Sequence, residues 1–481
     1  MYGAYRVEAI RAAEAAAIEA AGDGVLMGRA AAGLAQETLG ELRRRGRVYG
    51  SRVLLAVGPG NNGGDALFAA ATLARRGVTV RAWRTSAVVH GLGWAAFLAA
   101  GGQELDGAAA MASLPRADLV IDGVFGIGGR GGLPGPVARF ASACRDTGVP
   151  VVAVDLPSGL PTDPPFLRAE GPDFKPALPE HFRAALTVTF GGHKLCHVLQ
   201  PARSRCGRIE LVDIGLEMGG PAVRCWEPGD LAAAWPVPDE SSDKYGRGVV
   251  GIDAGSVRYP GAGVLVTLGA VHAGAGFVRY TGAPTVAALI NQRLPNVVIG
   301  EGRVSARVLG SGWGDRADGP QVVAGAIHSG LPVVIDADAL GFLPASGCHE
   351  RVLLTPHAGE LARLLGGDRD EVEADPLAAV AAAARTTGAT VLLKGATQYV
   401  ATPGRSTVDI AVPGPAWTAQ AGSGDVLAGI CGTLLAAGLQ TATAAAVAAG
   451  IQALAAERHP GPVPPQDLAG GLAETIQSIY R

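Results

Sequence analysis

The segment Gln420-Ala421-Gly422-Ser423-Gly424-Asp425, followed directly by Val426-Leu427-Ala428-Gly429-Ile430, decides how the second half of this chain folds. Its two glycines permit backbone conformations that other residues avoid, and they let a ligand approach closely. Apolar residues then recur at helical spacing, which predicts a helix that begins near Ser423. A helix that starts after a glycine turn presents free N–H groups to an anion. The segment therefore predicts an anion site at a helix start.

Asp425 lies in the first turn of this predicted helix. A carboxylate is unfavourable beside a bound phosphate, but it can act as a base toward a hydroxyl group next to that phosphate. A carboxylate in the first helical turn also complements the helix dipole without any catalytic role. The local pattern leaves both interpretations of Asp425 open.

Upstream of this segment, the second half repeats one pattern, in which a short apolar run is followed by a glycine-rich or polar loop. The predicted strands span residues 249–253, 304–309, 332–335, 352–354 and 390–393. Strands that alternate with helices predict a parallel sheet with the loops at its carboxyl edge.

The first half shows the same pattern at residues 52–57, 117–122 and 149–155. These predicted strands lead into Gly58-Pro59-Gly60-Asn61-Asn62-Gly63-Gly64-Asp65, residues 123–132, and Leu156-Pro157-Ser158-Gly159. We expect a helix over 66–76 after the first loop. Because the carboxyl ends of parallel strands lie together, the three loops should form one ligand crevice.

The chain has 481 residues, which is too long for one ordinary hydrophobic core and predicts several domains. A connector rich in proline, glycine and charge divides the two α/β patterns. We expect domains over 1–218 and 240–481, joined by a linker over 219–239. The predicted fold class is α/β, with helices on both faces of each sheet.

Composition excludes several function classes. The net charge of −3 argues against a general nucleic-acid-binding protein. The six cysteines form no Cys-x-x-Cys pair, so neither a zinc site nor a disulfide scaffold is indicated. No apolar run reaches the length of a membrane span, and the N-terminus lacks a signal pattern, so we expect a soluble cytoplasmic protein.

Polar side chains follow the predicted strands of the first half. Asn62, Asp122 and Ser158 would bring together several oxygens and little charge, which is typical of a monovalent-cation site rather than a zinc site. Asp155 ends its strand at the expected crevice, where it could do acid–base work. Taken singly, Asp122 and Asp155 are better explained as caps of the following turns. Their convergence on one sheet edge favours a function.

In the second half, Lys394-Gly395-Ala396-Thr397 offers a cation and a turn after the strand over 390–393. Together with the anion site at Gly422 to Asp425, it is typical of a cradle for nucleotide phosphates. Lys394 alone would more often be an ordinary strand-end lysine.

The motifs of the two halves resemble two known enzyme families. Residues 1–215, with Gly58 to Asp65, Asp122 to Gly132 and Val154-Asp155-Leu156-Pro157-Ser158-Gly159, resemble the NAD(P)H-hydrate epimerase domain, which is Rossmann-like. Residues 240–478 resemble the ADP-dependent NAD(P)H-hydrate dehydratase of the ribokinase-like superfamily. That second resemblance rests on Lys244-Tyr245-Gly246-Arg247-Gly248, Tyr259-Pro260-Gly261-Ala262, Thr355-Pro356-His357, Lys394-Gly395-Ala396 and Gly422-Ser423-Gly424-Asp425.

The resemblance implies roles for individual residues. In the epimerase domain, Asp155 would be catalytic, and the substrate would contact Asn61, Asn62, Gly63, Gly64, Asp65, Gly126, Ile127, Gly128, Gly129, Arg130, Gly131, Gly132 and Asp155. Potassium would be bound by Asn62, Asp122 and Ser158. In the dehydratase domain, Asp425 would be the catalytic base, and the hydrated nucleotide would contact Ala262, Gly312, Gly314, His357 and Asp425. The adenine nucleotide would contact Lys394, Gly395, Ala396, Thr397, Gln398 and Gly424.

The implied function is repair of hydrated NAD(P)H. The first domain would interconvert the R and S epimers, and the second would dehydrate the S epimer at the expense of ADP, giving AMP and phosphate. The resemblance also implies magnesium for the dehydratase. The partners would be these small molecules alone, with no nucleic acid or membrane, in a homo-oligomer. The chain departs from the family at Gln420-Ala421, where Thr-Gly is usual.

Two other hypotheses remain open at this point. A ribokinase-like small-molecule kinase, with ATP as the donor, would share the phosphate-site sequence. The first domain could also be a non-catalytic binding module, because domains of this fold occur in scaffold proteins. The joint presence of Asn62, Asp122, Asp155 and Ser158 argues against that second alternative.

Overall fold

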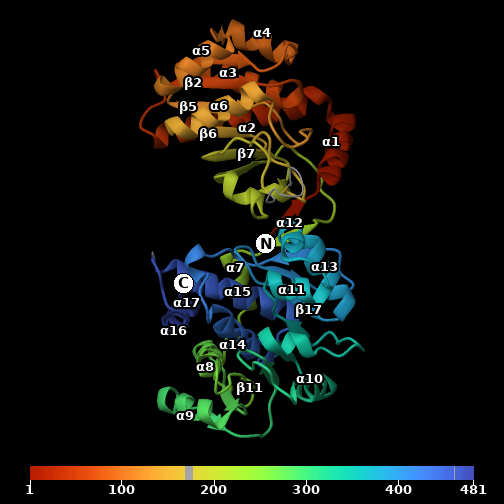
Figure 1. Cartoon of the computed structure of the whole chain (residues 1–481). Coiled ribbons are helices and arrows are strands. Elements are labelled where there is room, and N and C mark those ends of the chain that lie inside the picture. Colours follow the sequence, from red (N-terminus) through yellow and green to blue (C-terminus); the bar gives the residue numbers. More distant parts are fainter. Residues whose placement is uncertain (168–176, 460, 481) are drawn as a thin grey trace. The chain divides into compact units, whose positions relative to one another are not determined.

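The computed structural model describes residues 1–167, 177–459 and 461–480. The chain divides into two compact units (Figure 1). One unit comprises Gly3–Ala222, and the other comprises Met1–Tyr2 together with Val223–Arg481. Each unit is built on its own α/β arrangement, as the sequence predicts.

The first unit contains a fully parallel sheet. Its strands lie in the order β4 (Gln103–Leu105), β3 (Thr79–Arg84), β2 (Arg52–Val57), β5 (Leu119–Gly123), β6 (Val151–Val154), β7 (Leu186–Phe190) and β9 (Arg208–Val212). The three strands that carry the predicted loops are therefore neighbours in the sheet. Their carboxyl ends meet at one edge, which confirms the geometry expected from the sequence.

Helices cover both faces of this sheet. They are α1 (Val7–Ala21), α2 (Asp23–Arg44), α3 (Gly60–Arg75), α4 (Gly91–Ala99), α5 (Gly107–Ser113) and α6 (Gly135–Thr147). Strand side chains alternate between the faces, so Val53 and Leu55 pack in one apolar cluster with α2 and α3. Leu54 packs in the opposite cluster, with Phe140 of α6. A short parallel pair, β1 (Tyr2–Tyr5) with β8 (His193–Lys194), places Tyr5 opposite Lys194.

The expected loop before α3 is wrong in one respect. The helix begins at Gly60 rather than at residue 66, so Asn61 to Asp65 occupy its first turns. The glycines in this stretch serve close packing, because a Cβ on Gly63 would lie 2.2 Å from the Gly58 carbonyl oxygen. Side chains larger than hydrogen would push the helix start away from the end of β2.

The second unit contains a mixed sheet. Its strands lie in the order β13 (Val298–Ile299), β12 (Phe277–Tyr280), β11 (Val249–Asp253), β14 (Ala306–Leu309), β15 (Val333–Ile335), β16 (Val352–Leu354), β17 (Thr390–Leu393), β18 (Tyr399–Ala401), β19 (Val408–Ile410) and β10 (Val223–Cys225). Pairing is parallel from β13 to β17 and antiparallel around β18. The parallel part again gathers strand-end loops at one edge.

Helix α14 (Ser423–Ala436) of the second unit begins at the residue that the sequence predicts. The others are α7 (Pro228–Ala234), α8 (Pro260–His272), α9 (Pro284–Arg293), α10 (Gly319–His328), α11 (Ala358–Leu365), α12 (Arg369–Ala374), α13 (Pro376–Thr387), α15 (Thr441–Glu457), α16 (Pro465–Gly470) and α17 (Leu472–Ile479). From Val426 onward every residue of α14 is buried. The helix packs against α8 and α15 and contributes to the largest apolar cluster of the unit.

Glycines make the contact between α14 and α8 close. A Cβ on Gly429 would lie 2.1 Å from the Val266 carbonyl oxygen, and one on Gly269 would lie 2.2 Å from that of Val426. The two helix backbones therefore approach each other without intervening side chains. This approach fixes the position of the α14 N-terminus relative to the sheet.

Residues 219–239, which the sequence predicts to be a linker, contain β10 and α7. Val223 and Cys225 are buried in a parallel pairing with β19, and Leu231 joins the apolar cluster of the second unit. Apart from Met1–Tyr2, the second unit thus begins at Val223. Within the described residues, no helix combines the length and the apolar character needed to span a membrane.

Replacing Gly429 by alanine should lower the free energy of unfolding by about 1–3 kcal/mol, because the new methyl group would collide with the α8 backbone. Gly325→Ala in α10 is the matched control, since a Cβ there meets nothing within 4 Å and should stabilise the helix by about 0.5–1 kcal/mol. Denaturant unfolding curves of both variants measure the difference. An unchanged midpoint for Gly429→Ala would contradict the close approach.

Candidate functional site

The first unit has a cavity of about 500 Å³ at the carboxyl edge of its sheet. The predicted site residues that line it are Asn61, Asn62, Asp65, Gly126, Ile127, Gly128, Gly129 and Asp155. Gly63 and Gly64 instead lie buried within α3. Arg130, Gly131 and Gly132 lie further along the same β5–α6 loop, where the Gly132 amide donates to the Gly159 carbonyl at 2.7 Å.

Asp122 and Ser158 form a buried polar cluster beside the cavity. The Ser158 amide and hydroxyl donate to the two Asp122 oxygens at 2.7 and 2.6 Å, and both side chains are fully buried. The Phe125 amide donates to the Ser158 hydroxyl oxygen at 2.8 Å. Burial raises the pKa of Asp122 to about 7, although the hydrogen bonds from Ser158 lower it.

Asn62 approaches this edge from the first turn of α3. Its Nδ2 atom is buried and has no hydrogen-bond partner among the described residues. Its Oδ1 atom lies 2.8 Å from the place that a Cβ on Gly126 would take, and Asp155 Oδ2 lies 3.4 Å from the same place. Gly126 therefore marks the point where Asn62 and Asp155 face the loop after β5.

Asp155 forms a buried ion pair with Lys194. The Lys194 ammonium donates to Asp155 Oδ1 at 2.5 Å, to the Thr189 hydroxyl at 2.9 Å and to the Phe190 carbonyl at 2.9 Å. Lys194 is only 1% exposed. Asp155 has a φ of 68°, in the left-handed region that residues with a side chain rarely adopt, so the turn after β6 holds it in a strained conformation.

The sequence does not predict that Lys194 is buried, because lysine is almost never fully buried unless it is paired. Its partner lies 39 residues earlier in the chain, and only the neighbouring positions of β6 and β7 bring them together. The signal that could have been used is the position of Lys194 just after an apolar strand. It belongs to the segment Gly191-Gly192-His193-Lys194, which directly follows β7.

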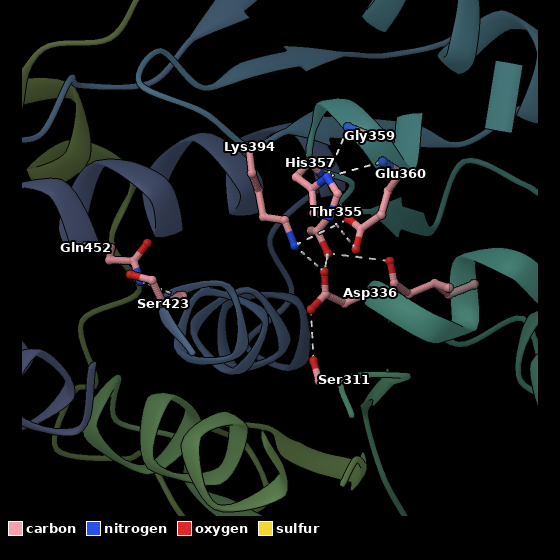
Figure 2. A network of polar contacts seen from close by, with 10 residues as sticks. Ser311, Asp336, Thr355, His357, Gly359, Glu360, Lys394, Ser423 and Gln452 are labelled. Atoms are coloured by element: carbon pink, nitrogen blue, oxygen red, sulfur yellow. Dashed lines mark hydrogen bonds and ion pairs between the residues drawn. The ribbon is translucent and has the colours of Figure 1, made fainter. Parts of the chain in front are cut away.

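In the second unit, a polar network centred on Asp336 lies at the carboxyl edge of the sheet (Figure 2). The Lys394 ammonium donates to Asp336 Oδ1 at 2.6 Å, and the Thr355 hydroxyl donates to the same oxygen at 2.8 Å. The Ser311 hydroxyl donates to Asp336 Oδ2 at 2.8 Å. Burial lowers the pKa of Lys394, but the charges of Asp336 and Glu360 outweigh burial and raise it.

His357 and Glu360 hold the start of α11 beside this network (Figure 2). His357 Nδ1 accepts hydrogen bonds from the amides of Gly359 and Glu360, and Glu360 Oε2 accepts one from the His357 amide at 2.7 Å. The second imidazole nitrogen, Nε2, lies 3.2 Å from Glu360 Oε1. Glu360 Oε2 also lies 4.0 Å from the Lys394 ammonium. Lys394 therefore connects the start of α11 with the polar network around Asp336.

Asp425 lies in the first turn of α14, after Gly422 at φ 93°. Burial raises the pKa of Asp425 to about 6; Asp336 adds to the rise, while the charge of Lys394 and a hydrogen bond from Ser311 oppose it. The Lys394 ammonium lies 3.2 Å from where a Cβ on Gly424 would be, so a side chain there would meet it. The structure thus brings Lys394, Gly424 and Asp425 together at the helix start.

Three further predicted residues, Ala262, Gly312 and Gly314, lie at the same edge of the sheet. A Cβ on Gly312 would lie 2.5 Å from Cβ of Ala262, and Gly312 has a φ of 67°. The Gly314 amide donates to Asp338 Oδ2 at 2.8 Å. Gly312 therefore lets the loop after β14 approach the first turn of α8.

Two features remain at this edge: the segment that follows Lys394, which the sequence predicts to contact a nucleotide, and Gln420. Gly395 and Ala396 are exposed after Lys394, whereas Thr397 is buried and the Gln398 carbonyl accepts a hydrogen bond from the Ala411 amide. The Gln420 amide donates to the backbone carbonyls of Trp417 and Val463 at 2.8 and 3.1 Å. Gln420 therefore ties the turn before α14 to the loop before α16.

Asp336, Ser311 and Thr355 are the residues that the sequence did not single out as a site. They come from the ends of β15, β14 and β16, and each becomes significant only through its hydrogen bonds. Of the three, only Asp336 shares a sequence signal with Asp122 and Asp155, because each of these is an aspartate at or just after the end of an apolar strand.

Comparison with known proteins gives matches over both halves. The model described as NAD(P)H-hydrate dehydratase matches residues 250–478, and the model described as YjeF-related protein N-terminus matches residues 23–196. The chain is 44% identical over 454 residues to the bifunctional NAD(P)H-hydrate repair enzyme Nnr of Mycobacterium tuberculosis, covering 92% of this chain and 91% of that protein. The enzyme of the same name from Mycobacterium leprae is 44% identical over 488 residues, covering 99% and 98%.

A solved structure of similar fold is the ADP/ATP-dependent NAD(P)H-hydrate dehydratase of Bacillus subtilis, co-crystallised with ATP and Mg²⁺. It has a TM-score of 0.50 and 24% identity, and the match covers 53% of this chain and 99% of that one. The NAD(P)H-hydrate epimerase of Clavibacter sepedonicus is 41% identical over 229 residues, which is 45% of this chain and 92% of that protein.

Proposed function

The chain belongs to the family of bifunctional NAD(P)H-hydrate repair enzymes, and from that premise we propose which residues perform each of its two activities. Epimerisation and dehydration of hydrated NAD(P)H are those activities, and a nucleotide is the co-substrate of the dehydration. The observation that carries the assignment of residues is the convergence of Lys394, Gly424 and Asp425 at the start of α14.

The second unit is the proposed dehydratase, with ADP as the phosphoryl donor. The N–H groups at the start of α14 and the Lys394 ammonium would bind the phosphates. Asp425 would take the proton from the hydroxyl group of the S hydrate as that oxygen attacks the β-phosphorus and AMP leaves. Loss of phosphate and of a proton from the neighbouring carbon then restores NAD(P)H.

Asp336 has a supporting role in this proposal. It holds the Lys394 ammonium in place. Its negative charge also adds to the rise in the pKa of Asp425 that burial causes. Ala262, Gly312, Gly314 and His357 would contact the hydrated nucleotide. Magnesium would be bound chiefly through the nucleotide phosphates, and Asp338 and Glu360 would be the carboxylates that hold it.

The first unit is the proposed epimerase. Asp155 is a catalytic group in this proposal, and the cavity at the start of α3 is the substrate site. The strained turn and the ion pair with Lys194 fix the Asp155 carboxylate at the cavity wall. The start of α3 and the loop after β5 would contact the substrate. We place the domain boundary between Ala222 and Val223. That the protein is a homo-oligomer and that it is cytoplasmic stay predictions of the sequence.

Potassium is the proposed ion of the epimerase, bound by Asn62, Asp122 and Ser158. The residues fit such an ion, because Asp122 is a buried carboxylate with no cation paired to it among the described residues. The unpartnered Asn62 amide also fits, since turning it over exchanges its nitrogen for an oxygen. The ion would supply a positive charge that keeps Asp122 ionised.

The dehydration rate should fall as the pH is lowered through about 6. Only the ionised form of Asp425 accepts a proton, and its raised pKa of about 6 means that the ionised form is lost below that pH. We expect kcat/KM with the S hydrate and ADP to drop about tenfold per pH unit below 6. A profile that stays flat from pH 7 to 5, with the fold intact by circular dichroism, would contradict this role.

Asp425→Asn should reduce dehydration by about 100-fold to 10,000-fold and leave epimerisation unchanged, because it removes the base and keeps the shape of the side chain. Recovery of NAD(P)H absorbance measures the first activity, and chromatography of the R and S hydrates measures the second. Asp370→Asn on the exposed face of α12 is the matched control.

Normal dehydration by the Asp425 variant would exclude the assigned base. The same assay run with ADP and with ATP separates the donors. Turnover of ATP alone, with release of a phosphorylated product, would favour a small-molecule kinase instead.

Epimerisation should depend on potassium and saturate with it, while choline chloride at equal ionic strength should not replace it. Potassium should also raise the melting temperature, because an ion that binds only the folded state stabilises it. Ser158→Ala should need more potassium for half-maximal activity than the wild type, and Ser113→Ala in α5 should need the same amount. Equal activity in choline and potassium would exclude the proposed ion site.

A further inference from the structure

Helix α1 (Figure 1) precedes residue 23, where the match to the N-terminal family begins, and its residues form part of the wall of the epimerase cavity. Arg11, Glu14 and Ile18 of this helix line the cavity together with Asp155. None of the roles proposed above falls on α1.

Two hydrogen bonds fasten α1 to the loops that surround the cavity. The Arg11 guanidinium donates to the Ile127 carbonyl at 3.3 Å, in the loop after β5. At the start of the helix, the Val7 amide donates to Asp163 Oδ2 at 3.1 Å, in the segment that follows β6. These contacts hold the cavity face of α1 against the same loops that carry Asp155 and the predicted substrate contacts.

Glu14 interrupts the apolar stripe of this helix. Ile10, Glu14 and Ile18 follow one another at four-residue spacing and therefore lie on one helix face. Ile10 is fully buried, and Ile18 packs against the apolar cluster of the first unit. A glutamate on this face is costly unless it has a partner. Among the described residues, the side chain of Glu14 makes no hydrogen bond or ion pair, so its carboxyl group is available to a molecule in the cavity.

The groups around Glu14 favour its protonated form. Burial raises the pKa of Glu14 above its ordinary value, and the negative charge of Asp155 raises it further. The positive charges of Lys194 and Arg11 act in the opposite direction and are weaker. Asp155, in contrast, is fixed directly to the Lys194 ammonium. The cavity thus holds two carboxyl groups in different environments, an arrangement that suits one acid and one base.

We propose that Glu14 is a second catalytic residue of the epimerisation, an acid that acts on the hydroxylated ring carbon together with the base Asp155. This inference rests on the proposed epimerase function of the first unit. Glu14 lies on a helix and Asp155 at the end of a strand, so each contacts the bound ring from a different wall of the cavity in this proposal.

The proposed step conserves atoms and electrons. Glu14 gives its proton to the ring hydroxyl, the carbon–oxygen bond breaks, and water leaves while the lone pair of the ring nitrogen forms a carbon–nitrogen double bond. A water molecule then adds to the other face of that carbon, Asp155 takes its proton, and the electron pair returns to the nitrogen. The reverse direction exchanges the two roles, and proton exchange with solvent resets both carboxyl groups.

The experiment uses the full chain without ADP, so that dehydration does not consume the S hydrate. Purified R hydrate is converted in water enriched in oxygen-18, and chromatography with mass spectrometry follows the S hydrate. We expect one solvent oxygen in each S molecule formed, above the exchange measured without enzyme. We expect Glu14→Gln to lower kcat for epimerisation by at least about 100-fold with little change in KM.

The pH profile separates a catalytic role from a structural one. The wild-type rate should fall at high pH as Glu14 loses its proton, and this fall should be absent from the residual activity of Glu14→Gln. Glu14→Asp should restore part of the rate. Glu19→Gln, at an exposed position of the same helix, should behave as the wild type.

Each result has a distinct meaning. A wild-type rate and pH profile in Glu14→Gln would overturn the role of Glu14 and leave the epimerase assignment intact. Epimerisation without incorporation of solvent oxygen would overturn the proposed step. Failure of the wild-type chain to interconvert the epimers would overturn the proposed function of the first unit itself.

Discussion

A buried lysine–aspartate ion pair at the carboxyl ends of parallel strands is the constraint on which each unit depends. Lys194 binds Asp155 in the first unit, and Lys394 binds Asp336 in the second. Removing a charge from water is costly, and only a close partner with further hydrogen bonds compensates for it. Thr189 and the Phe190 carbonyl supply those bonds to Lys194, whereas Ser311 and Thr355 supply them to Asp336.

The two pairs serve different chemistry. In the first unit the paired carboxylate is itself the proposed catalytic group, and the ion pair with Lys194 sets its position. In the second unit the paired carboxylate lies behind the lysine, and the proposed base is the neighbouring Asp425, whose pKa burial raises to about 6. A buried pair can therefore orient a catalytic group, and its carboxylate can add to the rise in pKa that burial causes in a neighbouring acid, as Asp336 does for Asp425.

Backbone packing delivers these groups to their places. Close contacts without side chains, such as Gly429 against α8 and Gly63 against the Gly58 carbonyl, set the starts of α14 and α3 at the sheet edge. The same strand order that gathers the loops also buries the strands on both faces, so their apolar runs are nearly continuous. Such runs make the strands and the start of α14 predictable, whereas the glycines at the start of α3 are typical of a loop and hide the true beginning of that helix at Gly60.

The sequence by itself determined the α/β class, the two sheets and the strand-end loops, because apolar runs and glycine turns are local signals. It also marked Asp425, Asp155, Asp122 and Lys394 as candidates. Only the tertiary structure decided which groups lie together: Lys194 with Asp155, Asp336 with Lys394, and Glu14 within the cavity of the first unit. Pairing and desolvation depend on residues far apart in the chain, and no local pattern encodes them.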